Sequence, residues 1–124
     1  MLLNQKSILV AEDEDINFLY IKEVLKTLNV NVLHARNGVE AVSYCKNDNT
    51  IVLVLMDIKM PIMNGYEATK EIRRFKPYLA IIAQTAFALL EDRRRTLECG
   101  CNDYISKPFS REALINLIKK YLNG

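Results

Sequence analysis

The chain has 124 residues, of which 50% are hydrophobic and 26% are charged, and its formal net charge is +2. These values are typical of one soluble globular domain, expected to occupy residues 1–124. The small net charge argues against direct nucleic-acid binding, and the absence of any apolar run near the ~20 residues of a membrane span argues against membrane contact.

Three cysteines, Cys45, Cys99 and Cys101, are an odd number in a chain long enough to fold without disulfides. Because the N-terminus also lacks a signal-peptide pattern, we expect the protein to be cytoplasmic. Cys99 and Cys101 could form half of a metal site. However, the sole histidine, His34, is distant in sequence and there is no second cysteine pair. We interpret all three cysteines as ordinary thiols.

Strands and helices are predicted to alternate along the whole chain. In chain order, we expect strand 7–11, helix 15–28, strand 30–35, helix 38–46, strand 51–56, helix 64–75, strand 80–84, helix 89–99, strand 102–106 and a last helix that Ser110 can cap. In helix 38–46, Val39 and Val42 are expected to face inward. Residues 91–96 are polar, which suits an exposed surface.

The strand at 51–56 is apolar without alternation, as expected for a strand buried on both faces. Five strands alternating with five helices predict an α/β fold, a doubly wound (flavodoxin-like) parallel sheet. Chain order does not fix strand order. The common order for five strands is 2-1-3-4-5, which places the switch point between strands one and three.

Polar residues stand where the predicted strands end. Glu12 and Asp13 follow the first strand, Asp57 ends the third, Thr85 ends the fourth and Lys107 follows the fifth. In a parallel sheet these ends share one edge, so we expect the five side chains to converge. Three crowded carboxylates repel one another and need a cation, and oxygen ligands favour Mg²⁺.

A carboxylate beside a magnesium ion predicts phosphoryl chemistry. Asp57 could attack phosphorus and form an aspartyl phosphate, while Lys107 neutralises charge and Thr85 donates a hydrogen bond to a phosphoryl oxygen. Taken singly, each residue also has an ordinary interpretation: a helix cap, a residue after a strand, or loop material. Their joint placement at four strand ends favours the functional interpretation.

Four motifs across nearly the whole chain resemble the receiver domains of two-component response regulators: ILVAEDEDIN, LVLMDIKMPIMNGYEA, AQTA and DYISKPF. The resemblance implies that Asp57 accepts a phosphoryl group from a histidine kinase or a histidine phosphotransfer domain. It also implies that Mg²⁺, or Mn²⁺ in its place, is held by Glu12, Asp13, Asp57 and the main-chain carbonyl of Lys59.

The resemblance further implies that Thr85 and Tyr104 are the switch pair, the two residues that move when the domain is phosphorylated. It identifies Lys107 as the lysine that is invariant in the family, and it implies a cis peptide bond between Lys107 and Pro108. The implied output partner binds the face formed by helix 89–99, strand 102–106 and the last helix. Such a domain is a phosphoacceptor rather than an enzyme, apart from its own phosphorylation and dephosphorylation. Lys59 and Phe87 occupy positions that tune dephosphorylation in the family.

Asn17 and the loop after Asp57 most resemble receivers of hybrid histidine kinases, and the alternative is a stand-alone response regulator. A phosphatase with an aspartate nucleophile would need a second acid where the chain has Lys59. A nucleotide-binding module would need a glycine-rich phosphate loop, which the sequence lacks. A degenerate receiver that acts by binding alone is a further alternative, although each expected site residue is present.

Overall fold

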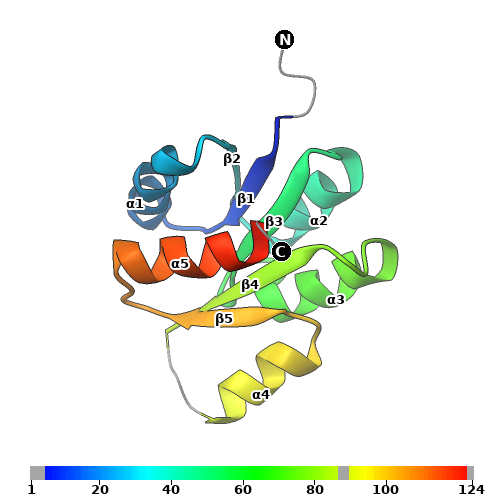
Figure 1. Ribbon diagram of the computed structural model, residues 1–124. Helices are drawn as coiled ribbons and strands as arrows, with labels where there is room; N and C mark the ends of the chain where they lie inside the picture. Colours follow the sequence, from blue (N-terminus) through cyan, green and yellow to red (C-terminus); the bar gives the residue numbers. More distant parts are fainter. Residues whose placement is uncertain (1–4, 87–89, 123–124) are drawn as a thin grey trace.

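The computed structural model describes residues 5–86 and 90–122, which form a five-stranded parallel sheet in the order β2-β1-β3-β4-β5 (Figure 1). The strands are β1 Ser7–Ala11, β2 Asn31–Ala35, β3 Ile51–Asp57, β4 Ala80–Thr85 and β5 Asp103–Ser106. Each lies within one residue of its predicted bounds. The predicted strand order is confirmed, and β1 and β3 are neighbours at the switch point.

The helices that connect the strands also match the prediction, with two differences. They are α1 Asp15–Leu25, the 3₁₀ helix η1 Lys26–Leu28, α2 Gly38–Asn47, α3 Gly65–Phe75, α4 Leu90–Glu98 and α5 Arg111–Leu122. The helix predicted over 15–28 therefore tightens into a 3₁₀ turn, which ends at Asn29 in the left-handed region with a φ of 54°. Leu89, the predicted start of the next helix, lies outside the described residues.

The second difference concerns the inward face of α2. Val39 was expected to face inward but is 48% exposed, so that prediction is wrong. Ala41 and Cys45, one helical turn apart, are the side chains that α2 buries. These small residues occupy the turn-spaced positions against the sheet, and Val42 is half-buried beside them.

Two hydrophobic layers lie on opposite faces of the sheet, because successive strand residues point to opposite sides. On β1, Ile8 and Val10 pack with α1 and α5, whereas Leu9 and Ala11 pack with α2 and α3. Figure 1 shows α1 and α5 together on one side of the sheet. Since helices cover both faces, β3 is buried along nearly its whole length.

The start of α3 is held close to the end of β3. Asn64 and Glu67 form a reciprocal capping box, in which each side chain accepts a hydrogen bond from the other residue's main-chain N–H. Gly65 follows, and a Cβ atom there would lie 2.4 Å from the carbonyl oxygen of Asp57. Only glycine permits this approach, which fixes the loop after Asp57 at the carboxyl edge of the sheet.

None of the helices described in residues 5–86 and 90–122 combines the length and the apolar character needed to cross a membrane.

Candidate functional site

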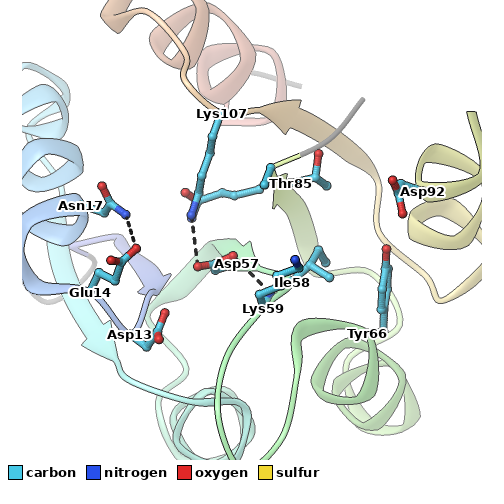
Figure 2. Close-up of a pocket in the computed structure, with 12 residues that line it drawn as sticks. Asp13, Glu14, Asn17, Asp57, Ile58, Lys59, Tyr66, Thr85, Asp92 and Lys107 are labelled. Carbon is cyan, nitrogen blue, oxygen red and sulfur yellow. Dashed lines mark hydrogen bonds and ion pairs between the residues drawn. The ribbon is translucent and has the colours of Figure 1, made fainter. Parts of the chain in front are cut away.

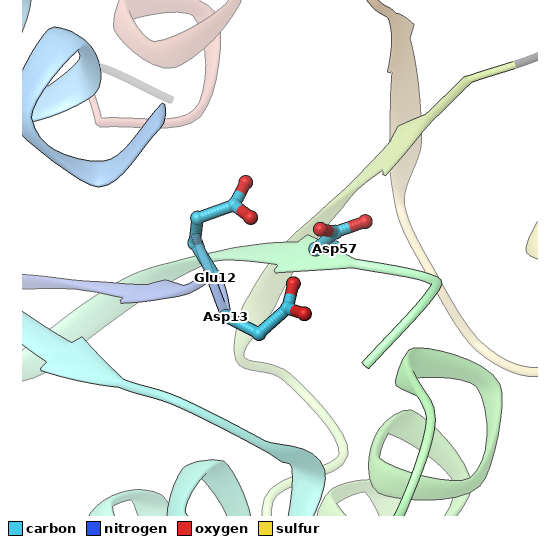
Figure 3. Close-up of side chains that lie close together, drawn as sticks. All are labelled: Glu12, Asp13 and Asp57. Carbon is cyan, nitrogen blue, oxygen red and sulfur yellow. The ribbon is translucent and has the colours of Figure 1, made fainter. Parts of the chain in front are cut away.

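Three carboxylates meet at the carboxyl edge of the sheet. Glu12 and Asp13 directly follow β1, and Asp57 is the last residue of β3. One carboxylate oxygen from each of the three lies within 4.8 Å of the others, and Figure 3 shows the three side chains turned toward a common space. The convergence predicted for these acids is therefore present, at a spacing that one metal ion could bridge.

Burial makes this acidic cluster electrostatically costly. Glu12 is fully buried and Asp57 is 6% exposed, whereas Asp13 is exposed to solvent. Burial, and then the nearby charge of Asp57, raise the pKa of the Glu12 carboxyl above its ordinary value. Cationic partners offset this cost, so the site favours positive charge between the acids.

Lys107, directly after β5, supplies one such charge. Its Nζ donates to Glu12 Oε1 at 3.2 Å and to Asp57 Oδ2 at 3.1 Å. Burial alone would lower the pKa of Lys107, but the two carboxylates outweigh it and the net pKa is raised. The ammonium group therefore stays charged at neutral pH. The bond between Lys107 and Pro108 is cis, as the resemblance implied.

The other oxygen of Asp57 is bound by the main chain. The N–H of Lys59 donates to Asp57 Oδ1 at 3.2 Å. The carboxylate is thus oriented by Lys107 on one oxygen and by a backbone N–H on the other. The proposed role of the Lys59 carbonyl as a metal ligand stays a prediction.

Asp57 opens into a cavity of about 370 Å³ at this edge of the sheet (Figure 2). Thr85, buried at the end of β4, lines the same cavity, as do Lys107 and Asp13. Asn17 also lines it, and its amide donates to Glu14 Oε1 at 2.9 Å. The structure therefore brings Thr85 to the same cavity as Asp13, Asp57 and Lys107.

Tyr104 is placed differently from the other predicted site residues. It is half-buried in β5 opposite Ala83 of β4, whereas Thr85 pairs with Ser106. The guanidinium carbon of Arg93 lies 5.0 Å from the centre of its ring, a cation–π contact. Tyr104 does not line the cavity that holds Asp57. Phe87 lies outside the described residues.

Several side chains near the site were not identified from the sequence. His34 Nε2 lies 2.7 Å from the carbonyl oxygen of Glu12, and its ring stacks on Phe18 with centroids 3.7 Å apart. A carbonyl only accepts, so Nε2 carries the proton and His34 fixes the main chain of Glu12. The pairing of β1 with β2 creates this contact, and no local motif signals it.

Gln84, fully buried beside Thr85, also lines the cavity. Its side-chain amide has no hydrogen-bond partner among the described residues. In the sequence, Gln84 is the one polar residue of the predicted strand 80–84, and this could have marked it as a candidate site residue.

The family model of the response regulator receiver domain matches residues 8–119. The chain belongs to this family. Its sequence is 34% identical over 119 residues to the polar-differentiation response regulator DivK of Brucella anthropi, a match that covers 94% of this chain and 96% of that protein.

Two solved receiver domains are also similar to this one. One is the receiver domain of the sensor histidine kinase PA1611 from Pseudomonas aeruginosa PAO1, with a magnesium ion coordinated in its active-site cleft. Its TM-score is 0.89 at 34% identity, over 97% of this chain and 99% of that chain. The other is the receiver domain of Saccharomyces cerevisiae Ssk1 in complex with the histidine phosphotransfer protein Ypd1. Its TM-score is 0.87 at 32% identity, over 95% and 89% of the two chains.

Proposed function

We propose that this receiver accepts a phosphoryl group onto Asp57 and switches conformation in response. The observation that carries the proposal is the environment of Asp57: a buried carboxylate at a strand end, held by Lys107 and a backbone N–H and open to a cavity. A helix cap would need none of these features. The whole of residues 1–124 would then act as one phosphoacceptor domain.

Glu12, Asp13 and Asp57 fit a divalent cation, because they offer oxygen ligands within 4.8 Å of one another and Asp13 is exposed to solvent. Mg²⁺, or Mn²⁺, prefers such oxygen ligands and retains several waters. The PA1611 receiver, which holds magnesium, supports this choice. The bound ion would neutralise charge on the transferring group, with the main-chain carbonyl of Lys59 as a further ligand.

The chain's own residues would position and stabilise the transfer. A carboxylate oxygen of Asp57 attacks phosphorus and forms a new O–P bond while the N–P bond of a phosphohistidine breaks and its electron pair returns to the imidazole. Lys107, already within 3.1 Å of Asp57, shifts its hydrogen bonds toward the phosphoryl oxygens. The hydroxyl of Thr85 donates a further hydrogen bond to the same group.

Thr85 and Tyr104 would carry the signal away from the site. When Thr85 turns toward the phosphoryl group, the space near β4 changes and the ring of Tyr104 moves inward, which alters the face formed by α4, β5 and α5. The cation–π contact between Arg93 and Tyr104 connects that ring to α4. An output partner would bind this face.

The phosphoryl donor would be a histidine kinase or a histidine phosphotransfer domain. The Ssk1 receiver, bound to the phosphotransfer protein Ypd1, supports this class of donor. The proposed activity is limited to the domain's own phosphorylation and dephosphorylation. We place it in the cytoplasm, which the free thiols of Cys45, Cys99 and Cys101 support.

Two parent proteins are proposed for the receiver. The similarity to the PA1611 receiver supports the first possibility, the receiver part of a hybrid sensor kinase. The second, a stand-alone regulator, is supported by DivK, which is also 34% identical to this chain and is matched over 96% of its own length. An immunoblot of the source cells with an antibody to this domain separates them. A band at a mass far above that of a 124-residue chain supports the hybrid kinase, and a band at the mass of such a chain supports the stand-alone regulator.

Intact-mass spectrometry after incubation with acetyl phosphate tests the main proposal, with and without Mg²⁺. We expect one phosphoryl adduct that requires Mg²⁺ and is absent from Asp57→Asn. Asp48→Asn is the matched control, because it makes the same chemical change in the loop between α2 and β3. A folded protein that forms no adduct, or an adduct that persists in Asp57→Asn, would contradict the proposal.

A further inference from the structure

Two cysteines face each other in the turn between α4 and β5. The sulfur atoms of Cys99 and Cys101 are 3.9 Å apart, and both side chains are free thiols at 6% exposure. A disulfide requires about 2 Å between sulfur atoms. The pair would therefore have to close by roughly 2 Å, a change within reach of side-chain rotation and a small main-chain shift.

The turn that carries the pair is firmly built. Gly100, between the two cysteines, has a φ of 114°, which side-chain-bearing residues rarely adopt. Arg73 of α3 donates from Nε to the Gly100 carbonyl at 2.7 Å and from another guanidinium nitrogen to Asn102 Oδ1 at 2.7 Å. These contacts hold the turn in which the two sulfur atoms lie 3.9 Å apart.

Cys99 is also reachable by a small oxidant. It lines a cavity of about 510 Å³ whose other lining residues come from α3 and α4, including Lys70, Arg94 and Arg95. The hydrogen bond with Cys101 lowers the pKa of the Cys99 thiol to about 7, and Lys70 adds to the effect. The same contact and burial raise the pKa of Cys101. Cys99 is therefore the readier of the two to become a thiolate, the form that reacts with oxidants.

We propose that Cys99 and Cys101 are a peroxide-sensitive thiol pair that closes to an intramolecular disulfide. The Cys99 thiolate attacks one oxygen of hydrogen peroxide, the O–O bond breaks, and a sulfenic acid and water form after proton transfer. Cys101 then attacks the Cys99 sulfur, the S–S bond forms, the S–O bond breaks and a second water leaves. Two thiols and one peroxide thus give one disulfide and two waters.

Closure would also change how α4 is held. In the reduced protein, the Cys99 sulfhydryl donates to the carbonyl of Thr96, in the last turn of α4, at 3.1 Å. The sulfur of Cys101 lies 3.7 Å from the Thr69 hydroxyl of α3. A disulfide removes both sulfhydryl protons and draws the sulfurs together, so the C-terminal turn of α4 loses its hydrogen bond from Cys99, and α3 loses its contact with Cys101. The inference stands whether or not Asp57 is phosphorylated.

The test treats the folded chain with hydrogen peroxide, then denatures it and measures its free thiols by differential alkylation. We expect the peptide that holds Cys99 and Cys101 to become lighter by two hydrogens and to resist alkylation until it is reduced. Cys45 is the internal control, because burial raises its pKa to about 11 and its thiol should remain alkylable. Cys99→Ser should slow oxidation of Cys101 at least about tenfold. Cys101→Ser should leave a sulfenic acid at Cys99 that dimedone traps.

The wild-type protein alone decides the main point, whether or not the variants fold. Oxidation of Cys45 as fast as Cys99, a disulfide between two chains, or thiols that remain unoxidised would each overturn the proposal. Hydrogen exchange then tests the effect on α4. We expect faster amide exchange over 90–98 in the oxidised protein and no change in α5, and unchanged exchange over 90–98 would overturn that part.

Discussion

Helices α3 and α4 lie on the same side of the fold but are held in different ways. Helix α3 buries five residues, begins with a capping box and places Gly65 against the main chain of Asp57. Among the described residues of α4, the buried one is Thr96. Helix α4 instead contacts aromatic rings through arginines: Arg93 lies over Tyr104, and Arg95 lies 4.3 Å from the ring centre of Tyr66.

The difference teaches how one helix can stay fixed while a neighbouring helix on the same side moves. Each buried aliphatic side chain contributes about 1.5–3 kcal/mol, whereas an exposed cation–π contact contributes about 0.5–1 kcal/mol. Moving α3 would expose core residues such as Ile72. Moving α4 would mainly break the contacts of its arginines with Tyr104 and Tyr66. We therefore expect α3 to anchor the loop after Asp57 and α4 to respond to events at the site.

The largest expected effect comes from truncating the buried face of α3. Ile72→Ala removes a fully buried side chain and should lower the free energy of unfolding by about 2–5 kcal/mol. Leu97→Ala is the matched change in α4, where the side chain is 50% exposed, and it should cost no more than about 0.5 kcal/mol. Urea unfolding measures both, and equal costs would remove the contrast between the helices.

The capping box should contribute the next largest effect. Asn64→Ala leaves the N–H of Glu67 without its side-chain acceptor, so we expect a loss of about 1 kcal/mol in the free energy of unfolding. Asn116→Ala, at an exposed position in α5, is the control and should be neutral or slightly stabilising. A loss no larger than the control's would show that the box does not hold α3.

A smaller effect is expected from the arginines of α4. Arg95→Ala removes the contact with Tyr66 and should cost less than about 1 kcal/mol of global stability. It should nevertheless raise amide exchange within α4 more than within α3. Arg94→Ala, an exposed neighbour in the same helix, is the control. If both variants exchange alike, the ring contact does not position α4.

The smallest effect concerns α5 at high pH. The Tyr121 hydroxyl donates to Asp103 Oδ2 at 2.9 Å, and burial together with this carboxylate raises its pKa to about 12. The folded protein holds this proton more tightly than the unfolded chain. The associated stability is therefore present below pH ~10 and is lost as the pH rises toward ~12. Tyr121→Phe should show a shallower decline in stability over this range, and parallel curves would refute the assignment.

The sequence predicted the fold well because its signals are local. Apolar runs and turn residues located every strand within one residue, and the asparagine–glycine pairs marked where α2 and α3 begin. The prediction that Val39 faces inward was wrong because helical periodicity over ten residues does not decide which apolar stripe faces the sheet. Ala41 and Cys45 occupy the buried positions instead.

The site was predictable only in part. Strand-end polarity identified the acids, Thr85 and Lys107, because parallel strands share one edge. The contact of His34 with the Glu12 carbonyl depends on strand register, which no local pattern encodes. The close approach of the Cys99 and Cys101 thiols depends on the left-handed Gly100 and on Arg73 from α3, so the sequence alone predicted ordinary thiols.

Hydrogen exchange on the phosphorylated receiver tests the central claim most directly. The protein is compared with and without acetyl phosphate and Mg²⁺, alongside Asp57→Asn and Thr85→Ala. We predict altered amide exchange over 90–98 and 103–106, little change over 65–75, and no response in Asp57→Asn. Thr85→Ala should accept the phosphoryl group without the change in α4. Equal responses in α3 and α4, or an unaltered α4 in the phosphorylated wild type, would contradict the account.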